Sequence, residues 1–278
     1  MTTAASRAQV EDALKERART MRRDIIDMVY AAQSGHPGGS LSAADILAVL
    51  YGHVMRHDPT NPKWPDRDRF IMSKGHASPG MYSALGEAGY FSTDLFPTFR
   101  KFGSILQGHN DALQVPGVEM SAGSLGQGLA FGMGHALAGK LDKKAYRTYV
   151  LLGDGECQEG QVWEAAMSAP FHKLDNLCAI VDRNHIQNDD FVEVTTALEP
   201  LADKWWAFGW HVEQCDGHDV GALIDAFDRC KAINGQPQVI IAHTVKGKGV
   251  SFMENSPAFH GKAPDKEQYP QALKELGF

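Results

Sequence analysis

The sequence of 278 residues is poor in cysteine, and its cysteines are widely spaced along the chain. The four thiols, at positions 157, 178, 215 and 230, give no C-x-x-C spacing, which excludes the usual zinc and thioredoxin-like motifs. Scattered thiols in a chain of this length are typical of a reducing compartment rather than of a disulfide scaffold. The first 23 residues also lack the apolar stretch of a secretion signal. We therefore expect a cytoplasmic protein.

The sequence also lacks an excess of positive charge and a convincing membrane span. Lys and Arg number 27 against 34 Asp and Glu, a net charge of −7, which argues against the basic face of a nucleic-acid-binding protein. Residues 120–139 carry no formal charge and contain a G-x-x-x-G pattern, as a membrane helix would. Six glycines, with Gln127 and His135, make this segment too polar for lipid. We expect a buried helix packed through small residues, and no membrane partner.

Glycine is abundant instead, at 28 of 278 residues, and short apolar runs alternate with helical patterns. The strand-like runs lie at residues 70–72, 149–152, 177–181 and 239–242, with a weaker run around Val212. Helical patterns lie between the later runs, at residues 162–168, 198–208 and 220–233. This alternation predicts an α/β fold, a mostly parallel sheet with helices on both faces. We expect one domain over residues 1–278, with an N-terminal helix at about 8–32 and a C-terminal helix at about 266–276.

Polar residues follow two of the predicted strands. Asp154 lies between two glycines directly after the strand at 149–152, and Asn184 follows the next strand 30 residues later. The carboxyl ends of parallel strands meet at one edge of a sheet, where ligands bind. A carboxylate there would repel a phosphate unless a hard cation such as Mg²⁺ lay between them. The alternative interpretation is two unrelated turns, since Asp and Asn favour turns in any case.

Several histidines lie in predicted loops beside glycine. They are His36 in SGHPGG, a loop predicted to end the first helix, His76 in KGHAS, His109 in QGHND and His260 in AFHGK. Imidazole exchanges protons near neutral pH, which suits chemistry at carbonyl and hydroxyl oxygens. A single histidine is more often structural, and we assign no role to the histidines outside such loops, at positions 185, 211, 218 and 243.

A further glycine-rich segment, SAGSLGQG at residues 121–128, opens the helix predicted around residues 120–139. Free N–H groups at a helix N-terminus attract anions. A glycine-rich cap on a tightly packed helix would have the same sequence, so both interpretations stay open.

In combination these motifs resemble those of transketolases. SGHPGGSLS, SKGHASPGMY, the GHND loop, SAGSLGQGLAFGMG, GDGECQEGQVWEAAM and the DRN turn occur in the order found in that family, over residues 21 to 261. The likeness is greatest to short, separately encoded N-terminal subunits. The resemblance implies the diphosphate-binding domain of the thiamine diphosphate-binding fold. It also implies an enzyme of carbohydrate metabolism, such as the pentose phosphate pathway, that transfers a two-carbon ketol unit from a ketose phosphate to an aldose phosphate.

The resemblance also implies roles for individual residues. Asp154, Asn184 and the main-chain carbonyl of Ile186 would hold Mg²⁺ or Ca²⁺ against the cofactor diphosphate. The other cofactor-binding residues would be Gly155 at the diphosphate, Gly123 and Leu125 near the aminopyrimidine, and Glu159 in an acidic network that links active sites across an interface. The catalytic residues around cofactor and substrate oxygens would be His36, His76, His109 and His260, of which His76 and His260 also contact the cofactor.

Activation of the cofactor in this family needs a glutamate and an aromatic pocket from a second, pyrimidine-binding domain. No residue of this chain matches that glutamate, and neither Glu87 nor Glu164 has motif support. We therefore expect a separate C-terminal partner subunit that carries this domain, in an α2β2 heterotetramer that is active only when both chains are present.

Two alternatives remain at this stage. The loop TVKGKG at 244–249 is closer to deoxyxylulose-phosphate synthase than to many long transketolases, and the GHND loop lacks the Pro-Glu pair common in the family. The chain could therefore belong to another thiamine-dependent enzyme or to a transketolase for an unusual sugar. It could also be a cofactor-binding subunit without catalysis.

Overall fold

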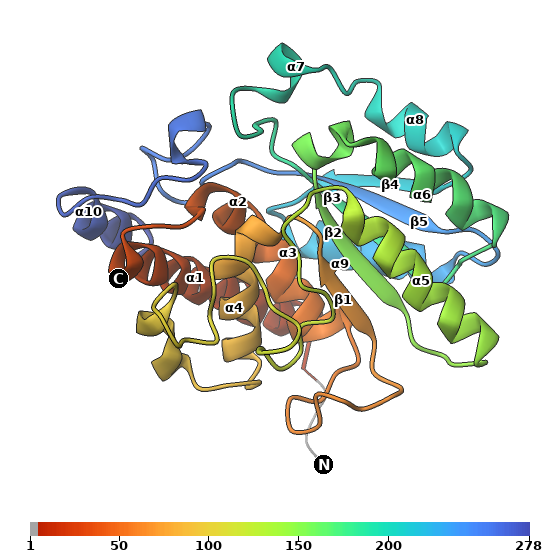
Figure 1. The fold of residues 1–278 in the computed structure, drawn as a ribbon, viewed down its shortest axis with the longest axis horizontal. Helices are drawn as coiled ribbons and strands as arrows, with labels where there is room; N and C mark the ends of the chain where they lie inside the picture. The colour runs from red at the N-terminus through yellow and green to blue at the C-terminus, as the bar shows by residue number, and fades with distance from the viewer. Residues whose placement is uncertain (1–4) are drawn as a thin grey trace.

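The computed structural model describes residues 5–278 and has a five-stranded sheet at its centre (Figure 1). The strands are β1 (Arg69–Met72), β2 (Thr148–Gly153), β3 (Leu177–Arg183), β4 (His211–Asp216) and β5 (Gln238–His243). They lie in the order β1-β2-β3-β5-β4, and each neighbouring pair is parallel. The predicted α/β fold and its strands are confirmed.

Helices cover both faces of the sheet (Figure 1). One face is covered by α1 (Arg7–Ala32), α3 (Ala44–Val49), α4 (Ser78–Glu87) and α9 (Val220–Ala232). The other is covered by α5 (Gln127–Leu141), α6 (Gly160–Phe171) and α8 (Leu201–Ala207). In β2, Tyr149 and Leu151 pack into the first core, and Val150 and Leu152 into the second. Burial on both faces explains why the strands read as continuous apolar runs.

Shorter elements connect these layers. They are α2 (Pro37–Ser42), a π-helical turn (Leu50–Val54), 3-10 turns at Gly75–Ala77, Thr93–Thr98, Gly155–Gln158 and Pro257–Phe259, α7 (Val192–Thr195) and α10 (Gln268–Glu275). An additional apolar cluster joins α10 to α1 through Ala272, Leu276 and Ile25. Both terminal helices, α1 and α10, begin and end within two residues of their predicted bounds.

The SGHPGGS segment was predicted to be a loop, but its second half is helical. The chain leaves α1 through Gln33, whose φ of 49° is left-handed, and is irregular only as far as His36. Pro37 then opens the short helix α2, because a proline at the first helical position has a suitable φ and no N–H to leave unpaired. His36 therefore caps a buried helix, which fixes its backbone.

Helix α5 is buried on one side only. A Cβ on Gly128 would lie 2.2 Å from the Ser73 hydroxyl oxygen, and one on Gly132 would lie 2.4 Å from Val150, so the predicted packing through small residues holds there. On the opposite side, Phe131 is 42% exposed and Leu141 is 74% exposed, which the prediction of a buried helix did not include. Over the described part of the chain, no helix combines the length and the hydropathy that a membrane crossing requires.

The carboxyl ends of the strands position the candidate functional residues. Because the sheet is parallel, β1, β2, β3 and β5 all deliver their following loops to one edge. The residues that arrive there directly after a strand include Lys74, Asp154, Asn184 and Thr244.

Candidate active site

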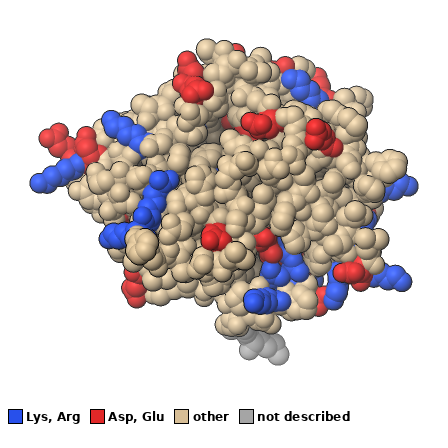
Figure 2. Space-filling model, in the orientation of Figure 1, with Lys and Arg blue, Asp and Glu red and all other residues tan. Residues whose placement is uncertain are grey.

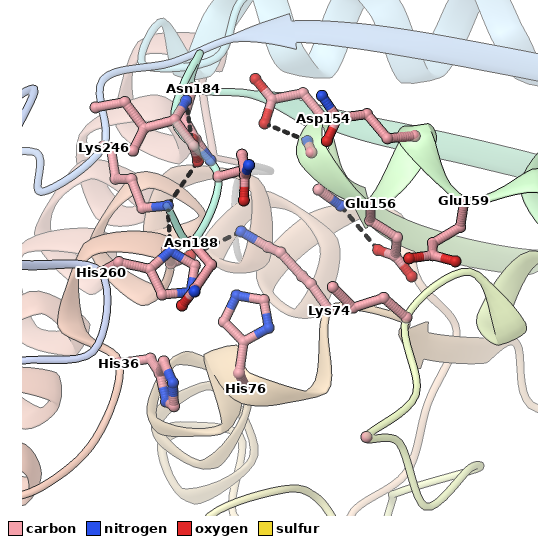
Figure 3. Close-up of a pocket in the computed structure, with 18 residues that line it drawn as sticks. His36, Lys74, His76, Asp154, Glu156, Glu159, Asn184, Asn188, Lys246 and His260 are labelled. Atoms are coloured by element: carbon pink, nitrogen blue, oxygen red, sulfur yellow. Dashed lines mark hydrogen bonds between the residues drawn. The ribbon is translucent and has the colours of Figure 1, made fainter. Parts of the chain in front are cut away.

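A pocket with an internal volume of about 320 Å³ opens at this edge of the sheet (Figure 3). Its walls come from the segments that follow β1, β2, β3 and β5, from α2 and from the loop before α5. The predicted site residues that line it are His36, His76, Gly123, Leu125, Asp154, Gly155, Glu159, Asn184, Ile186 and His260. The fold thus gathers residues spread over more than two hundred positions of sequence.

His109 is the predicted site residue that does not line this pocket. Its ring centroid lies 6.3 Å from that of His36, and its main-chain carbonyl accepts a hydrogen bond from the Tyr82 hydroxyl at 3.1 Å. Burial, and then the charge of Arg100, lower the pKa of His109. It therefore lies beside His36 but outside the pocket lining, at an exposed position.

Asp154 forms one wall of the pocket and is buried. Its Oδ2 accepts hydrogen bonds from the main-chain N–H of His185 at 2.5 Å and from Arg183 at 3.1 Å, and Oδ1 accepts from the N–H of Gly155 at 2.8 Å. Burial, and then the neighbouring Asp182 carboxylate, raise the pKa of Asp154. A bound cation would stabilise the charged form of a carboxylate in these surroundings.

Asn184 and Ile186 follow on the turn after β3. The side-chain oxygen of Asn184 accepts a hydrogen bond from the N–H of Ile186 at 3.2 Å. The carbonyl of Ile186 accepts a hydrogen bond from the Lys246 ammonium at 2.6 Å. Both oxygens belong to residues that line the pocket, as Asp154 does.

These oxygens suit a hard divalent cation. Among residues 5–278, no group of three or more His, Cys, Asp or Glu side chains has the arrangement of a metal centre. The predicted ligands are of another kind, because they combine one carboxylate, one amide and one main-chain carbonyl. Mg²⁺ and Ca²⁺ take such oxygen donors and complete their shells with water or phosphate oxygens. The carbonyl of Ile186 keeps a second lone pair beside the one that Lys246 uses.

Lys74 and Lys246 also line the pocket, although the sequence analysis gave neither a role. Lys74 forms an ion pair with Asp182, and both side chains are buried. Burial lowers the pKa of Lys246 to about 8, and the nearby Asp154 opposes this shift. The Lys246 ammonium, which forms no ion pair with a carboxylate among the described residues, suits an anion. The sequence did contain a signal for both lysines, because each lies in a glycine-rich loop, SKGHAS or TVKGKG, that follows a strand.

Three histidines cluster at the side of the pocket away from Asp154 (Figure 3). The ring centroids of His36 and His76 are 5.2 Å apart, those of His76 and His260 5.1 Å, and those of His36 and His260 5.5 Å. Burial lowers the pKa of His36 to about 4 and that of His260 to about 3, and it lowers the pKa of His76 well below its ordinary value. All three are therefore neutral imidazoles near pH 7.

Two of these rings have defined hydrogen-bonding states. Lys246 donates a hydrogen bond to Nδ1 of His260 at 2.7 Å, so the ring proton of His260 lies on Nε2. Nδ1 of His36 is buried and has no hydrogen-bond partner among the described residues. Buried polar atoms are normally paired, so a free nitrogen in a pocket indicates a place for a ligand group.

The glycine turns of the pocket are held by a glutamate that sequence reasoning missed. Glu156 is buried and accepts hydrogen bonds from the N–H of Gly126 at 2.9 Å and from that of Gly153 at 3.0 Å. It thereby ties the turn after β2 to the N-terminus of α5. A Cβ on Gly155 would lie 2.5 Å from that of Gln187, whereas one on Gly123 would meet no atom within 4 Å. Gly155 allows a close approach of two loops, and Gly123 leaves open space in the pocket.

Comparison with known proteins assigns a family to this arrangement. The family model described as "Transketolase, thiamine diphosphate binding domain" matches residues 13–278. The chain is 45% identical over 255 residues to one subunit of the apulose-4-phosphate transketolase of Phocaeicola vulgatus, covering 92% of this chain and 90% of the relative. It is 42% identical over 263 residues to 6-deoxy-6-sulfo-D-fructose transketolase subunit SqwG of a Clostridium species, covering 95% and 96%.

Among solved structures, the chain superposes on transketolase from Campylobacter jejuni with a TM-score of 0.91 and 36% sequence identity. The match covers 96% of this chain but 43% of that one. The chain thus spans less than half the length of that single-chain relative, and nearly all of the subunits named above.

Proposed function

The chain belongs to the transketolase family, as a thiamine diphosphate-binding domain, and we propose that it is one subunit of a two-chain transketolase. The observation that best supports this is the composition of the pocket. Hard oxygen donors lie at one side, three neutral histidines lie at the other, and Lys246 contacts both through the Ile186 carbonyl and His260. A diphosphate with its metal suits the first side, and a sugar with its hydroxyls suits the second.

At the diphosphate side, we assign Asp154, Asn184 and the carbonyl of Ile186 to Mg²⁺ or Ca²⁺. We assign Gly155, which lines the pocket beside Asp154, to contact with the phosphates. The ammonium group of Lys246 balances part of the negative charge that the metal leaves uncompensated, whereas that of Lys74 is paired with Asp182. Gly123 and Leu125 lie nearer the mouth of the pocket, where we place the contact with the cofactor rings.

At the sugar side, His36, His76 and His260 exchange protons with substrate hydroxyl groups. Bound thiamine diphosphate supplies the electron sink that breaking the bond between C2 and C3 of a ketose requires. His260 offers its Nε2 proton to a substrate oxygen, since Lys246 occupies Nδ1. His36 offers a free Nδ1 that can accept a proton or a hydrogen bond. We place His109 at the edge of this sugar side, since its ring lies beside that of His36.

A partner subunit fits the exposed face of α5 and α6. Both helices begin beside the pocket and run next to each other (Figure 1), and few charged side chains lie over them (Figure 2). Met167 and Phe171 on α6 are 63% and 82% exposed, and Phe131 and Leu141 are exposed on the neighbouring α5. We propose that the partner carries the pyrimidine-binding domain and the catalytic glutamate, covers this face, and forms an α2β2 complex. Glu159, at the rim of the pocket, then lies at the subunit interface.

The relatives suggest which sugars to test. Their names assign apulose 4-phosphate and 6-deoxy-6-sulfo-D-fructose to two different subunit pairs. We propose a ketose of this modified kind as the donor, with the sugar phosphates of the pentose phosphate pathway as the second candidate. We place the complex in the cytoplasm, since all four cysteines are free thiols.

The decisive experiment is co-expression with the product of the neighbouring open reading frame, followed by a donor and acceptor panel with added thiamine diphosphate and Mg²⁺. We expect ketol transfer by the complex and none by the chain alone. Robust transfer by the isolated chain would disprove the two-chain proposal, and use of pyruvate as donor would indicate a deoxyxylulose-phosphate synthase instead.

Asp154→Ala separates an enzyme from a non-catalytic subunit. We expect the variant complex to assemble and to lose transfer, because one metal ligand is missing. Unchanged transfer with Asp154→Ala would contradict the assigned metal site. If the wild-type complex assembles but transfers nothing from any donor in the panel, the chain is a non-catalytic subunit.

A further inference from the structure

Asp182 is a buried carboxylate that does not line the pocket but lies directly beneath it. It is the penultimate residue of β3 and is fully inaccessible to solvent. Its main-chain carbonyl accepts hydrogen bonds from the N–H of Asp154 at 3.3 Å and from that of Asn184 at 3.0 Å. It therefore contacts both of the side-chain ligands that we assign to the metal.

The carboxylate of Asp182 joins four segments of the chain. Oδ2 accepts hydrogen bonds from the Ser42 hydroxyl at 2.6 Å, from the Asn184 side-chain nitrogen at 3.0 Å and from the Lys74 ammonium, and Oδ1 accepts from the Thr244 hydroxyl. Burial alone would raise the pKa of Asp182, but the Lys74 charge and these hydrogen bonds outweigh it and lower the pKa. Asp182 does not line the pocket, so it is not placed to bind a metal there itself.

These contacts leave one orientation for the side-chain amide of Asn184. Its nitrogen faces Oδ2 of Asp182, and its oxygen accepts from the N–H of Ile186 at 3.2 Å. In the flipped amide, oxygen would face a carboxylate oxygen and nitrogen would face an N–H donor. Both pairings are repulsive, and both groups are buried, so the flipped state is strongly disfavoured.

The orientation matters because a metal binds the oxygen of an amide and not its nitrogen. We propose that Asp182 is a positioning residue, whose carboxylate holds the Asn184 amide with its oxygen on the Ile186 side of the pocket, available to the metal. This inference rests on the proposed function for its role, but the orientation itself does not depend on a metal, cofactor or partner. Groups that orient metal ligands in this way commonly change metal affinity by about 10- to 100-fold when they are removed.

The direct test is solvent exchange of the Asn184 side-chain NH₂, measured by NMR on the chain labelled with ¹⁵N-asparagine and identified by its loss in Asn184→Ser. Asn61 is the reference, since it is exposed and its side chain has no hydrogen bond among residues 5–278. In the wild-type chain without ligands, we expect exchange at least about tenfold slower than for Asn61, because the NH₂ is bonded to a buried carboxylate. Exchange as fast as that of Asn61 would overturn the proposal without any variant.

The double variant Lys74→Met/Asp182→Val removes the carboxylate together with its counter-ion, so that no buried charge is left unpaired. We expect rapid exchange of the Asn184 NH₂ in this variant. Slow exchange is expected in Ser42→Ala and Thr244→Val, each of which keeps Asp182 together with its counter-ion Lys74. Loss of protection in these controls to the same extent would show general loosening and overturn the specific role of Asp182.

In the reconstituted complex, the Mg²⁺ concentration for half-maximal binding of thiamine diphosphate should rise by about 10-fold or more in the double variant relative to Lys74→Met. An unchanged Mg²⁺ requirement would show that Asp182 does not prepare Asn184 for the metal. If the wild-type complex itself shows no Mg²⁺ dependence, the proposed metal site fails, and the exchange measurement still decides the orientation.

Discussion

At the scale of single residues, the pocket keeps its histidines neutral by burial and by nearby cations. Burial is the main cause of the low pKa of His36, and Arg100, His109 and Lys246 add to it. In His260 the charge of Lys246 is the next cause after burial. A neutral imidazole can either donate or accept, which suits a site that must move protons in both directions.

The first prediction is a pH-dependent stability caused by His36. In the unfolded chain this ring is protonated near its ordinary pKa of 6.5, and in the folded chain only near 4. The folded state therefore loses stability as the pH falls from about 6.5 towards 4, by up to about 1.4 kcal/mol per pH unit, and His36→Gln should reduce that slope. Guanidinium unfolding of both chains between pH 4.5 and 7 measures it.

The matched control is His172→Gln, at an exposed position. Equal slopes for the wild type and His36→Gln would show that the His36 ring takes up its proton in the folded state as readily as in the unfolded one.

At the scale of elements, α5 performs two tasks on opposite sides. Glycines on its inner side let it approach β1 and β2, since a Cβ on Gly132 would lie 2.4 Å from Val150. Its outer side exposes Phe131 and Leu141. Gly134 also lies on the outer side, where a Cβ would meet no atom within 4 Å. The core therefore requires glycine at position 132, whereas position 134 has room for a side chain.

The second prediction uses this difference. Gly134→Ala should raise the free energy of unfolding of the isolated chain by about 0.5–1 kcal/mol, because alanine favours the helix and meets no obstacle. Gly132→Ala should lower it by about 1–3 kcal/mol, because the new methyl group overpacks the core against Val150. Chemical denaturation of both variants tests the pair. Equal effects of the two substitutions would contradict the assigned faces of α5.

At the scale of the whole molecule, the pocket and the apolar face of α5 and α6 adjoin each other. Residues such as Glu159 and Leu125 line the pocket next to the points where α6 and α5 begin. A partner that covered the two helices would therefore also cover the pocket mouth. Shielding from water would strengthen the electrostatic interactions within the site.

The third prediction concerns this face. Phe171→Glu and Met167→Glu, both at exposed positions of α6, should prevent co-purification with the partner and abolish transfer in the mixture. The isolated variants should fold normally, because neither side chain is buried in the chain alone. Pull-down with a tagged partner, together with circular dichroism of the free chain, measures both effects.

Phe102→Glu is the control, since this fully exposed phenylalanine belongs to neither helix and lies in the loop after the 3-10 turn at Thr93–Thr98. Retained binding by Phe171→Glu and Met167→Glu, or equal loss with Phe102→Glu, would place the partner elsewhere.

Much of the fold and of the candidate site was predictable because it depends on local sequence and on one rule of geometry. Apolar runs mark the strands, and a parallel sheet brings the residues after those strands to one edge. Asp154, Asn184 and the glycine loops could therefore be placed together before the structure was known. The SGHPGGS segment was the local exception, since Pro37 starts a helix there.

Only the tertiary structure decided which groups meet. Asp182 is paired with Lys74 across 108 positions and with Ser42 across 140, and no local pattern indicates either contact. The same holds for Glu156 beneath the glycine turns, for His109 outside the pocket wall and for the exposed side of α5. Burial and hydrogen-bond partners depend on distant segments, whereas strand patterns and glycine turns are set by neighbours in the chain. The sequence by itself therefore determined the strands, the helices between them and the location of the site. Packing determined the protonation of its residues and their orientation.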